Sequence, residues 1–394
     1  MASKLARKPA IGVLPSTTEL ISALRRDCMA ALAERSVDRL DAALRRGCWI
    51  YGAGDYGRNI HQLLERHGIR CRGFIDQRAS ELTDAGLPVF APAAIGREEA
   101  TDSAVIIALH NFAFDQTPVF AWARATGFAD ILVPAELPDL LGPSAGSYWL
   151  KNRSHLLEHL DDLAILIEML DDPRSVETVV GIARYRMTAL PAAHPHADIS
   201  DQYFPRDLVL PKEPLRLIDG GAFIGEAWND ACRAGTLIDE WYCFEPDPVN
   251  FDKLSATVRA SDTRRAVLFP CGLGDRCGQA SFAAGAAAGS RMADSDAADM
   301  IVQVVAVDDV LPGANPNFIK LDIEGAESAA LDGMQRTLAE ARPQLAMSIY
   351  HLPGDLWELP FKVKQMLPGA SLHVRQHGFN GFDTVLYAIP QRRT

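Results

Sequence analysis

The stretch from Arg216 to Glu226 constrains the fold of this chain more than any other. It reads RLIDGGAFIGE. An apolar run that ends in an acid and glycines, before helix-forming residues resume, predicts a buried strand, a tight turn and a helix start. The glycines permit positive φ angles and close approach of a ligand, and the new helix offers free N–H groups. Dinucleotide sites and S-adenosylmethionine sites both use such a turn, so other stretches must decide between them.

The bulk composition limits the class of protein and of partner. The 394 residues are 48% hydrophobic and 23% charged, which allows two domains with separate cores. The net charge of -12 argues against nucleic acid as a partner, because that binding depends on Lys and Arg neutralising phosphates. A small-molecule or sugar substrate fits better. No apolar run approaches the roughly 18 residues that span a bilayer, and the opening residues lack the apolar core of a secretory signal.

The cysteines and histidines show no metal-binding pattern. The cysteines are scattered and none forms a C-x-x-C pair, which is typical of reduced thiols and predicts a cytoplasmic location. His155 and His159 have the spacing of one helix face, while His194 and His196 flank a proline. Neither pair has further ligands at a useful spacing, so we expect no metal site.

A second glycine turn lies in the first third of the chain, behind an N-terminal helical extension predicted over residues 1–46. Gly52, Gly54 and Gly57 form G-x-G-x-x-G between an apolar run and an amphipathic stretch, which is the strand-turn-helix context that this fingerprint requires. Asp76 ends the next predicted strand about 20 residues later, the separation expected for a ribose-binding acid. These four residues are a candidate second nucleotide site.

The region that contains this turn, residues 47–140, is predicted to be a smaller Rossmann-like α/β domain. It resembles the N-terminal nucleotide-sugar module of sugar acyltransferases in Ile50 to Gly54 (IYGAG), Gly73 to Asp76 (GFID) and Gly86 to Val89 (GLPV). The resemblance implies binding of a nucleotide or nucleotide-sugar. A structural or oligomerising role, with a possible homodimer, stays open because the tight turn needs its glycines in either case.

Residues 141–213 are predicted to be a helical connector. Apolar residues between Leu156 and Leu170 recur at the spacing of one helix face. Further on, Gln202 and Tyr203 place an amide beside an aromatic ring. Sugars are bound by ring stacking and polar contacts, so these two are candidate substrate residues. Packing of the connector against the next domain is the alternative of equal weight.

The second domain is predicted over residues 214–394. Glu245 ends its second strand about 20 residues after the central turn, where a carboxylate can accept from both hydroxyls of a ribose. Cys271 and Gly272 follow the third strand and could edge an adenine ring, and residues 284–292 could form a mobile lid.

Acids and a histidine follow later strands of this domain. Asp322 and Glu324 alternate at a strand end, so both are expected on one side at the carboxyl edge of the sheet, where ligands bind. His351 ends another buried strand. The alternating segments 371–376 and 384–389 predict an antiparallel hairpin that closes the sheet.

These stretches together resemble the FkbM-type methyltransferase family. The resemblance covers roughly residues 175–390 and is carried by Asp219 to Gly225, Phe244 to Pro246 and, most specifically, Ile319 to Glu327. It implies the α/β fold of class I methyltransferases, with S-adenosylmethionine as cofactor. It also implies O-methylation of a hydroxyl on a sugar, glycan or secondary metabolite. Phe223 stands where the family usually has Asn.

The implied site has a cofactor part and a catalytic part. The candidate cofactor-binding residues are Asp219, Gly220, Gly221, Phe223, Gly225, Glu226, Glu245, Cys271 and Gly272. The candidates for orienting or deprotonating the acceptor are Asp322, Glu324 and His351. His351 has the ordinary pKa best suited to act as a base at neutral pH. Alternatively, Asp322 contacts the cofactor, and Glu324 and Glu327 cap the following helix.

A metal-dependent form of the methyltransferase and two other functions stay open from the sequence. Asp322 and Glu324 could hold a divalent metal, as in catechol-type methyltransferases. The first glycine turn could serve an NAD(P)-dependent sugar oxidoreductase, although no Tyr-x-x-x-Lys pair follows it. The chain could also be a non-catalytic nucleotide-sugar-binding protein built from two Rossmann-like units.

Overall fold

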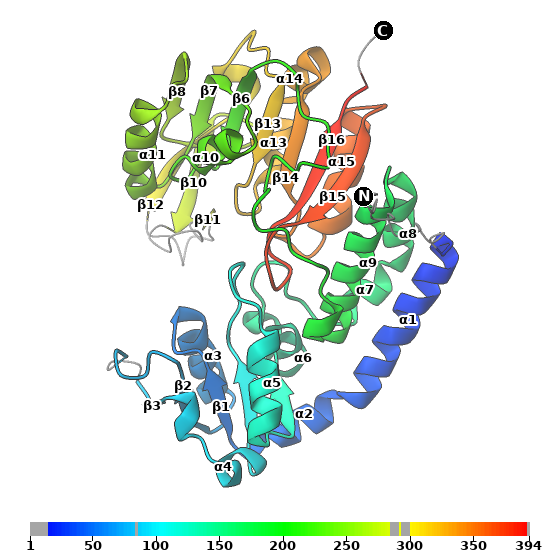
Figure 1. The fold of residues 1–394 in the computed structure, drawn as a ribbon, viewed down its shortest axis with the longest axis vertical. Helices are drawn as coiled ribbons and strands as arrows, with labels where there is room; N and C mark the ends of the chain where they lie inside the picture. The colour runs from blue at the N-terminus through cyan, green and yellow to red at the C-terminus, as the bar shows by residue number, and fades with distance from the viewer. Residues whose placement is uncertain (1–14, 83–85, 284–290, 293–299, 392–394) are drawn as a thin grey trace, which may run out of the picture.

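The computed structural model describes residues 15–82, 86–283, 291–292 and 300–391. Two α/β units, joined by connecting helices, lie one below the other in Figure 1. The parallel strands of both sheets point their carboxyl ends toward the other unit. No helix within the described ranges is long and apolar enough to cross a membrane.

A parallel sheet forms the N-terminal unit, in the order β3-β2-β1-β4-β5. Its strands are β1 (Cys48–Tyr51), β2 (Cys71–Ile75), β3 (Val89–Phe90), β4 (Ala104–Ile107) and β5 (Asp130–Leu132). Its helices are α3 (Asp55–Arg66), α4 (Arg97–Thr101), α5 (Thr117–Thr126) and α6 (Leu137–Leu141). The central strands β1 and β4 are buried along their whole length, because helices cover both faces of a parallel sheet.

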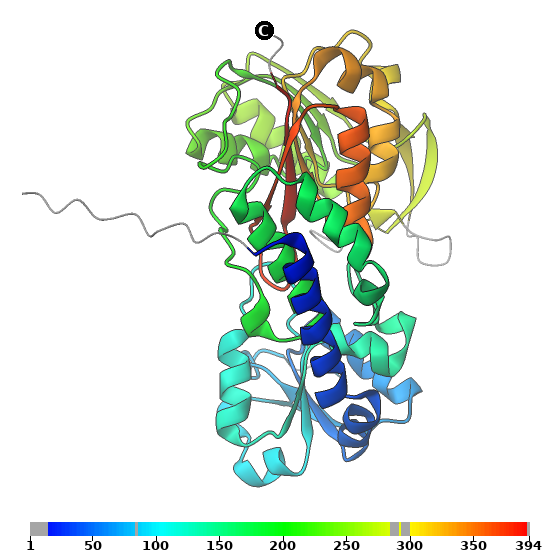
Figure 2. The same ribbon diagram turned by 90° about the vertical axis from the view of Figure 1, so that its right-hand side faces the viewer.

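Helices tie the two units together. The first, α1 (Thr17–Glu34), begins at a capping box formed by Ser16 and Glu19 beside the connector and runs toward the N-terminal unit, as Figure 2 shows. Its buried Leu24 and Cys28 belong to the same apolar cluster as the connector helices. The remaining helices of this part are α2 (Val37–Arg45), α7 (His155–Glu158), α8 (Leu160–Met169) and α9 (Pro173–Thr188).

The C-terminal unit is built on a seven-stranded sheet in the order β15-β16-β14-β13-β6-β7-β8. Strand β16 runs antiparallel to both of its neighbours, while the pairs from β14 to β8 are parallel. The strands are β6 (Leu215–Gly220), β7 (Ile238–Phe244), β8 (Arg265–Phe269), β13 (Phe318–Leu321), β14 (Gln344–Ser348), β15 (Ser371–Gln376) and β16 (Thr384–Ile389). The predicted fold class, a class I methyltransferase sheet with a closing hairpin behind a smaller Rossmann-like unit, is confirmed.

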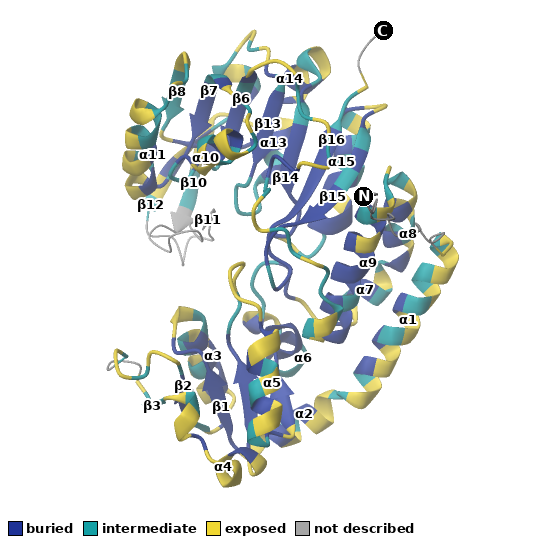
Figure 3. Ribbon diagram, viewed as in Figure 1, coloured by how far each residue is buried: buried dark blue, intermediate teal, exposed yellow. Residues whose placement is uncertain are grey.

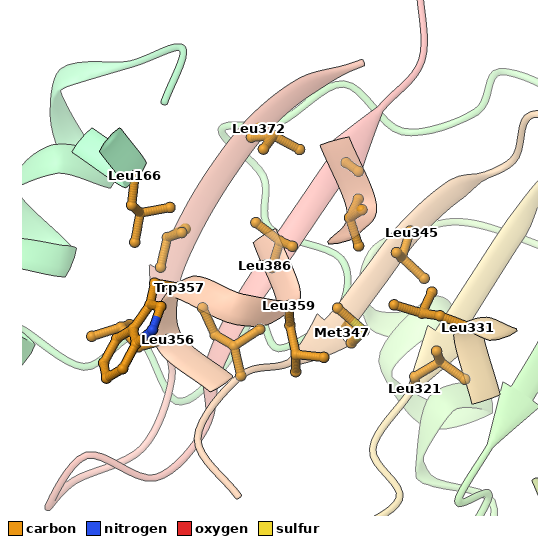
Figure 4. Close-up of a cluster of buried hydrophobic side chains, with 14 of the residues drawn as sticks. Leu166, Leu321, Leu331, Leu345, Met347, Leu356, Trp357, Leu359, Leu372 and Leu386 are labelled. Atoms are coloured by element: carbon orange, nitrogen blue, oxygen red, sulfur yellow. The ribbon is translucent and has the colours of Figure 1, made fainter. Parts of the chain in front are cut away.

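Helices connect the strands of this unit and pack against the sheet. They are α10 (Glu226–Arg233), α11 (Pro248–Ala260), α12 (Val307–Val310), α13 (Glu327–Asp332), α14 (Gln335–Ala341) and α15 (Asp355–Met366). In the burial view of Figure 3, the strands are largely buried and the outward faces of the helices are exposed. Figure 4 shows Leu321, Leu345 and Met347 of the sheet near Leu356 and Leu359 of α15, all in one apolar cluster. Each buried leucine contributes roughly 1.5–3 kcal/mol, so this core holds the strand ends firmly.

Two parts of the C-terminal unit were not predicted. Helix α15 is one. The other is a small sheet in the order β11-β10-β12-β9, with β9 (Gly272–Leu273), β10 (Gly278–Ala283), β11 (Arg291–Met292) and β12 (Met300–Val305). Of the lid expected at residues 284–292, residues 284–290 lie outside the described part of the chain.

The loop of the C-terminal hairpin joins the two units. The Asn380 side-chain amide donates to the carbonyl oxygens of Asn111 at 2.8 Å and Phe114 at 2.7 Å, just past β4. Trp149 Nε1 donates to the Asn380 carbonyl oxygen at 3.1 Å. Phe382 belongs to an apolar cluster that also contains Trp149 and residues of β1 and β4. The carboxyl edges of the two sheets are therefore connected by direct contacts.

Candidate functional site

The central turn connects β6 to α10 and can be built only with glycine at two positions. Gly221 has φ +69, and a Cβ atom there would lie 1.9 Å from the carbonyl oxygen of Asp322. Gly225 has φ +91, and its Cβ would lie 2.7 Å from Cγ2 of Thr257. The first glycine lets the turn lie directly against the end of β13, and the second lets α10 begin against α11.

A buried ion pair supports this turn from below. Asp219 is fully buried; its Oδ2 accepts from Trp241 Nε1 at 3.0 Å, and its Oδ1 lies 3.2 Å from Lys320 Nζ. The Lys320 ammonium also donates to the carbonyl oxygens of Gly220 and Gly221. Burial by itself would lower the pKa of Lys320, but the Asp219 and Asp322 carboxylates outweigh it and raise that pKa. Lys320 was not among the candidate residues.

Glu245 is bound to the backbone of the same turn. Its Oε2 accepts the Phe223 N–H at 2.8 Å, and its Oε1 accepts the Asp247 N–H at 2.9 Å. Burial raises the pKa of Glu245 to about 7. Phe223 has φ +49, in the left-handed region where Asn is far better tolerated than Phe.

The other cofactor candidates lie around this carboxylate. Gly220 ends β6 and is buried, and Glu226 is the exposed first residue of α10. Cys271 and Gly272 are buried at the point where the chain leaves β8 and enters β9. The cofactor-binding role of each of these residues stays a prediction.

The predicted catalytic residues meet at the carboxyl edge. Asp322 Oδ1 lies 3.3 Å from His351 Nε2, and Glu324 Oε2 lies 3.8 Å from the same nitrogen. On the opposite side, His351 Nδ1 lies 2.8 Å from Glu327 Oε1. Burial by itself would lower the pKa of His351, but these three carboxylates raise it well above its ordinary value. The imidazole is therefore held as a cation at neutral pH.

Glu327 anchors this arrangement. Its Oε1 and Oε2 accept the N–H groups of Ile323 at 2.9 Å and Gly325 at 3.0 Å, in addition to the contact with His351. It is almost fully buried at the first position of α13. Such a carboxylate orders the loop and orients the imidazole, which agrees with the capping role considered from the sequence.

Tyr203 reaches the site from the connector. Its hydroxyl donates to Asp322 Oδ2 at 2.6 Å and accepts from Gln202 Nε2 at 3.1 Å. The ring itself is buried, with Lys320 Nζ 5.2 Å from its centre, so it offers no free face for stacking on a sugar. Burial by itself would raise the pKa of Asp322, but His351, Lys320 and Tyr203 lower it. Asp322 is thus kept ionised.

A further carboxyl group at this edge escaped the sequence analysis. Asp383 directly precedes β16, is buried, and has φ +53. Burial and the nearby charge of Asp322 raise the pKa of Asp383 to about 7, against a contact from the Tyr350 side chain that lowers it. The signal in the sequence was its place beside the glycine-bearing hairpin loop.

The first glycine turn lies apart from this cluster, at the carboxyl end of the central strand β1 of the N-terminal sheet. Gly52 has φ +109, and a Cβ at Gly57 would lie 2.0 Å from the Gly52 carbonyl oxygen, so the fold itself requires both. Gly54 faces open space. Asp76 Oδ2 accepts the Ala53 N–H at 3.0 Å and its Oδ1 accepts the Arg78 N–H at 2.8 Å. A nucleotide site here stays a prediction.

Comparison with known proteins finds a similarity that centres on the C-terminal unit. Residues 219–380 match the model of the Methyltransferase FkbM domain. The structure of a methyltransferase FkbM from Methylobacillus flagellatus KT superposes with a TM-score of 0.76 at 22% identity, covering 95% of this chain and 100% of that one. The two-unit architecture as a whole therefore recurs in that protein.

Two other solved structures are more distant. A precorrin-6y C5,15-methyltransferase from Geobacter metallireducens GS-15 has a TM-score of 0.29 at 12% identity, covering 46% of this chain and 82% of its own. An rRNA methylase from Streptococcus thermophilus has a TM-score of 0.30 at 16% identity, covering 47% and 90%. No curated protein matches the sequence.

Proposed function

We propose that this chain, an enzyme with a methyltransferase FkbM domain, transfers a methyl group from S-adenosylmethionine to a hydroxyl group of a sugar-like acceptor. The observation that carries the proposal is the common location of three features at one sheet edge: the turn at Gly221, the Glu245 carboxylate and the cluster around Asp322. A nucleoside site and a site of acid–base chemistry thus adjoin each other.

The residues present fit the cofactor. Each oxygen of Glu245 accepts one backbone N–H group, which leaves lone pairs on both oxygens for ribose hydroxyls. Gly221 keeps the backbone of the turn free of any side chain, and Cys271 and Gly272 would edge the adenine. When bound, S-adenosylmethionine supplies a methyl carbon activated by its sulfonium.

The acceptor hydroxyl would be oriented and deprotonated by the acidic cluster. Asp322 stays ionised and can accept a hydrogen bond from the hydroxyl, while the cationic His351 holds Asp322 in place. Asp383 directly precedes β16 at the same edge, and burial together with the nearby charge of Asp322 raises its pKa to about 7, so we assign it the role of proton acceptor. Alignment of the reactants lowers the barrier by about 7–11 kcal/mol. A general base accelerates the reaction roughly 10²–10⁴-fold, which corresponds to only about 3–5 kcal/mol. Positioning by Tyr203, Asp322 and His351 should therefore matter most.

The proposal is tested by binding and by product analysis. Isothermal calorimetry with S-adenosylhomocysteine should show one site, whereas the oxidoreductase alternative requires tight NAD binding. Radiolabelled S-adenosylmethionine and a panel of free and nucleotide-linked sugars would then identify the acceptor, with mass spectrometry of the product locating the methyl group on oxygen. Tight NAD binding without a response to S-adenosylhomocysteine would overturn the proposal.

A further inference from the structure

The connector carries a second group of potential ligands away from the sheet edge. His155, Glu158 and His159 come from α7 and the residue after it, and each can offer a side-chain atom within 4.8 Å of the others. The i, i+3 and i+4 spacing places the three side chains on one side of the helix. Glu158 is exposed and both histidines are partly exposed, so a solvated ion can reach them.

The two imidazole rings are already oriented by their neighbours. His159 Nδ1 lies 2.8 Å from Asp162 Oδ2, and its ring stacks on Trp357 with the ring centres 4.6 Å apart. The His155 ring lies 4.6 Å from the His159 ring. A carboxylate on one nitrogen of an imidazole fixes the ring and leaves Nε2 available, which is the usual support of a metal-binding histidine.

A cavity opens beside these residues. It has a volume of about 480 Å³ and is lined by His155 and Glu158, together with Ser147, Tyr148 and Lys151. Two imidazoles and a carboxylate make up the protein ligand set of several catalytic zinc sites, where the remaining position faces a cavity and holds water or substrate. The cavity supplies the space that such an open position needs.

The cluster around Asp322 differs in this respect. Asp322, Glu327 and His351 also lie close enough to share an ion. There, however, Glu327 and His351 contact each other, Glu327 accepts two backbone N–H groups, and Asp322 accepts from Tyr203. Because a metal would have to displace these bonds, the connector group is the better metal site.

We propose that His155, Glu158 and His159 bind a divalent transition metal, with Zn²⁺ as the preferred ion, and leave an open coordination position toward the cavity. Asp162 is the positioning residue that orients His159. The site does not depend on the methyltransferase function proposed for the sheet edge.

The test uses the untagged full chain, treated with a chelator and then titrated with ZnCl₂ by calorimetry and with CoCl₂ by visible absorption. Cys232 and Cys277 are exposed and are replaced by Ser in every variant, because free thiols also bind zinc. We expect one equivalent of metal and a Co²⁺ spectrum typical of nitrogen and oxygen ligands. His155→Ala and His159→Ala should each weaken binding at least tenfold, and Asp162→Asn about tenfold.

The matched control is His61→Ala, which removes a partly buried histidine paired with Glu65 at i,i+4 and 3.6 Å; among the described residues this pair belongs to no group of three potential ligands. It should leave metal affinity unchanged. Circular dichroism confirms that each variant is folded. The absence of Zn²⁺ binding to the parent chain would overturn the proposal, as would unchanged affinity in folded His155→Ala and His159→Ala variants. Loss of binding only on His351→Gln would assign the metal to the Asp322 cluster instead.

Discussion

The two glycine turns of this protein share a local design but differ in what surrounds them. In both, an acid at the end of the neighbouring strand accepts a backbone N–H of the turn: Glu245 from Phe223 at 2.8 Å, and Asp76 from Ala53 at 3.0 Å. Only the turn of the C-terminal unit lies against a buried lysine, Lys320, and against the backbone carbonyl oxygen of Asp322. In both turns, the acid at the expected spacing stabilises the turn by accepting a backbone N–H group. The side chains that the neighbouring strands place beside the turn are what differ between the two sites.

The largest expected effect is on stability, and it compares a glycine that has no room for a Cβ atom with one that faces open space. Gly221→Ala would place a Cβ 1.9 Å from the Asp322 carbonyl oxygen, at a positive φ. We expect a loss of at least about 3 kcal/mol in the free energy of unfolding, measured by urea titration. Gly54→Ala in the first turn meets open space and should cost less than about 0.5 kcal/mol. Equal costs would contradict the close approach of the central turn to β13.

The next effect compares the two acids. Glu245→Ala should weaken S-adenosylhomocysteine binding by about 1.5–3 kcal/mol, because a charged hydrogen-bond acceptor is lost. Asp76→Ala removes the corresponding acid from the first turn and should leave that affinity unchanged. Calorimetry on both variants decides the question. If Asp76→Ala has the larger effect, the cofactor belongs to the N-terminal sheet.

The pH dependence of binding tests the same carboxylate without breaking the turn. With the pKa of Glu245 raised to about 7, its ionised fraction rises about tenfold between pH 6 and pH 8. Affinity for S-adenosylhomocysteine should rise in that window, and Glu245→Gln should abolish the dependence.

The same raised pKa predicts a stability effect of opposite sign. Because the folded protein holds the proton more tightly than the unfolded chain, Glu245 destabilises the fold as pH rises from its ordinary pKa to about 7. The Glu245→Gln variant should therefore lose less stability than the parent over that range. An identical stability profile for the two proteins would mean that Glu245 is not protonated near neutrality.

The smallest effect concerns Phe223. Its left-handed φ of +49 costs a non-glycine residue roughly 1–2 kcal/mol, and Asn tolerates this conformation better. Phe223→Asn should raise the free energy of unfolding by up to about 1 kcal/mol, seen as a higher melting temperature. Phe223→Ala keeps the Cβ and the strain, so it serves as the control. A destabilised Asn variant would show that packing of the Phe223 ring outweighs its backbone strain.

Much of the architecture could be predicted from the sequence because it depends on local patterns. The alternation in residues 371–376 and 384–389 predicted the closing hairpin, and the apolar run before Asp219 predicted the central strand. Asp322, Glu324 and His351 were expected at one edge because parallel strands share that edge. Their distances of 3.3 and 3.8 Å show that they meet. The edge strands β9 and β11 of the four-stranded sheet could not be predicted because they have only two residues each, too few for any periodicity.

The tertiary structure alone decided how these groups are charged and held. Strands β6 and β13 pair in the register that sets Lys320 opposite Asp219, and no local pattern specifies that register. The hydroxyl of Tyr203 reaches Asp322 only because the connector folds back over the sheet. From its ordinary pKa, His351 was the expected base. In the folded protein the carboxylates of Asp322, Glu324 and Glu327 raise its pKa and keep it cationic. In our proposal Asp383 is therefore the proton acceptor. The sequence thus determined the helices and strands and the carboxyl edge at which the acids lie. Long-range packing determined which of these groups are buried and which charges face each other. Burial and neighbouring charge together set the pKa values on which the chemistry depends.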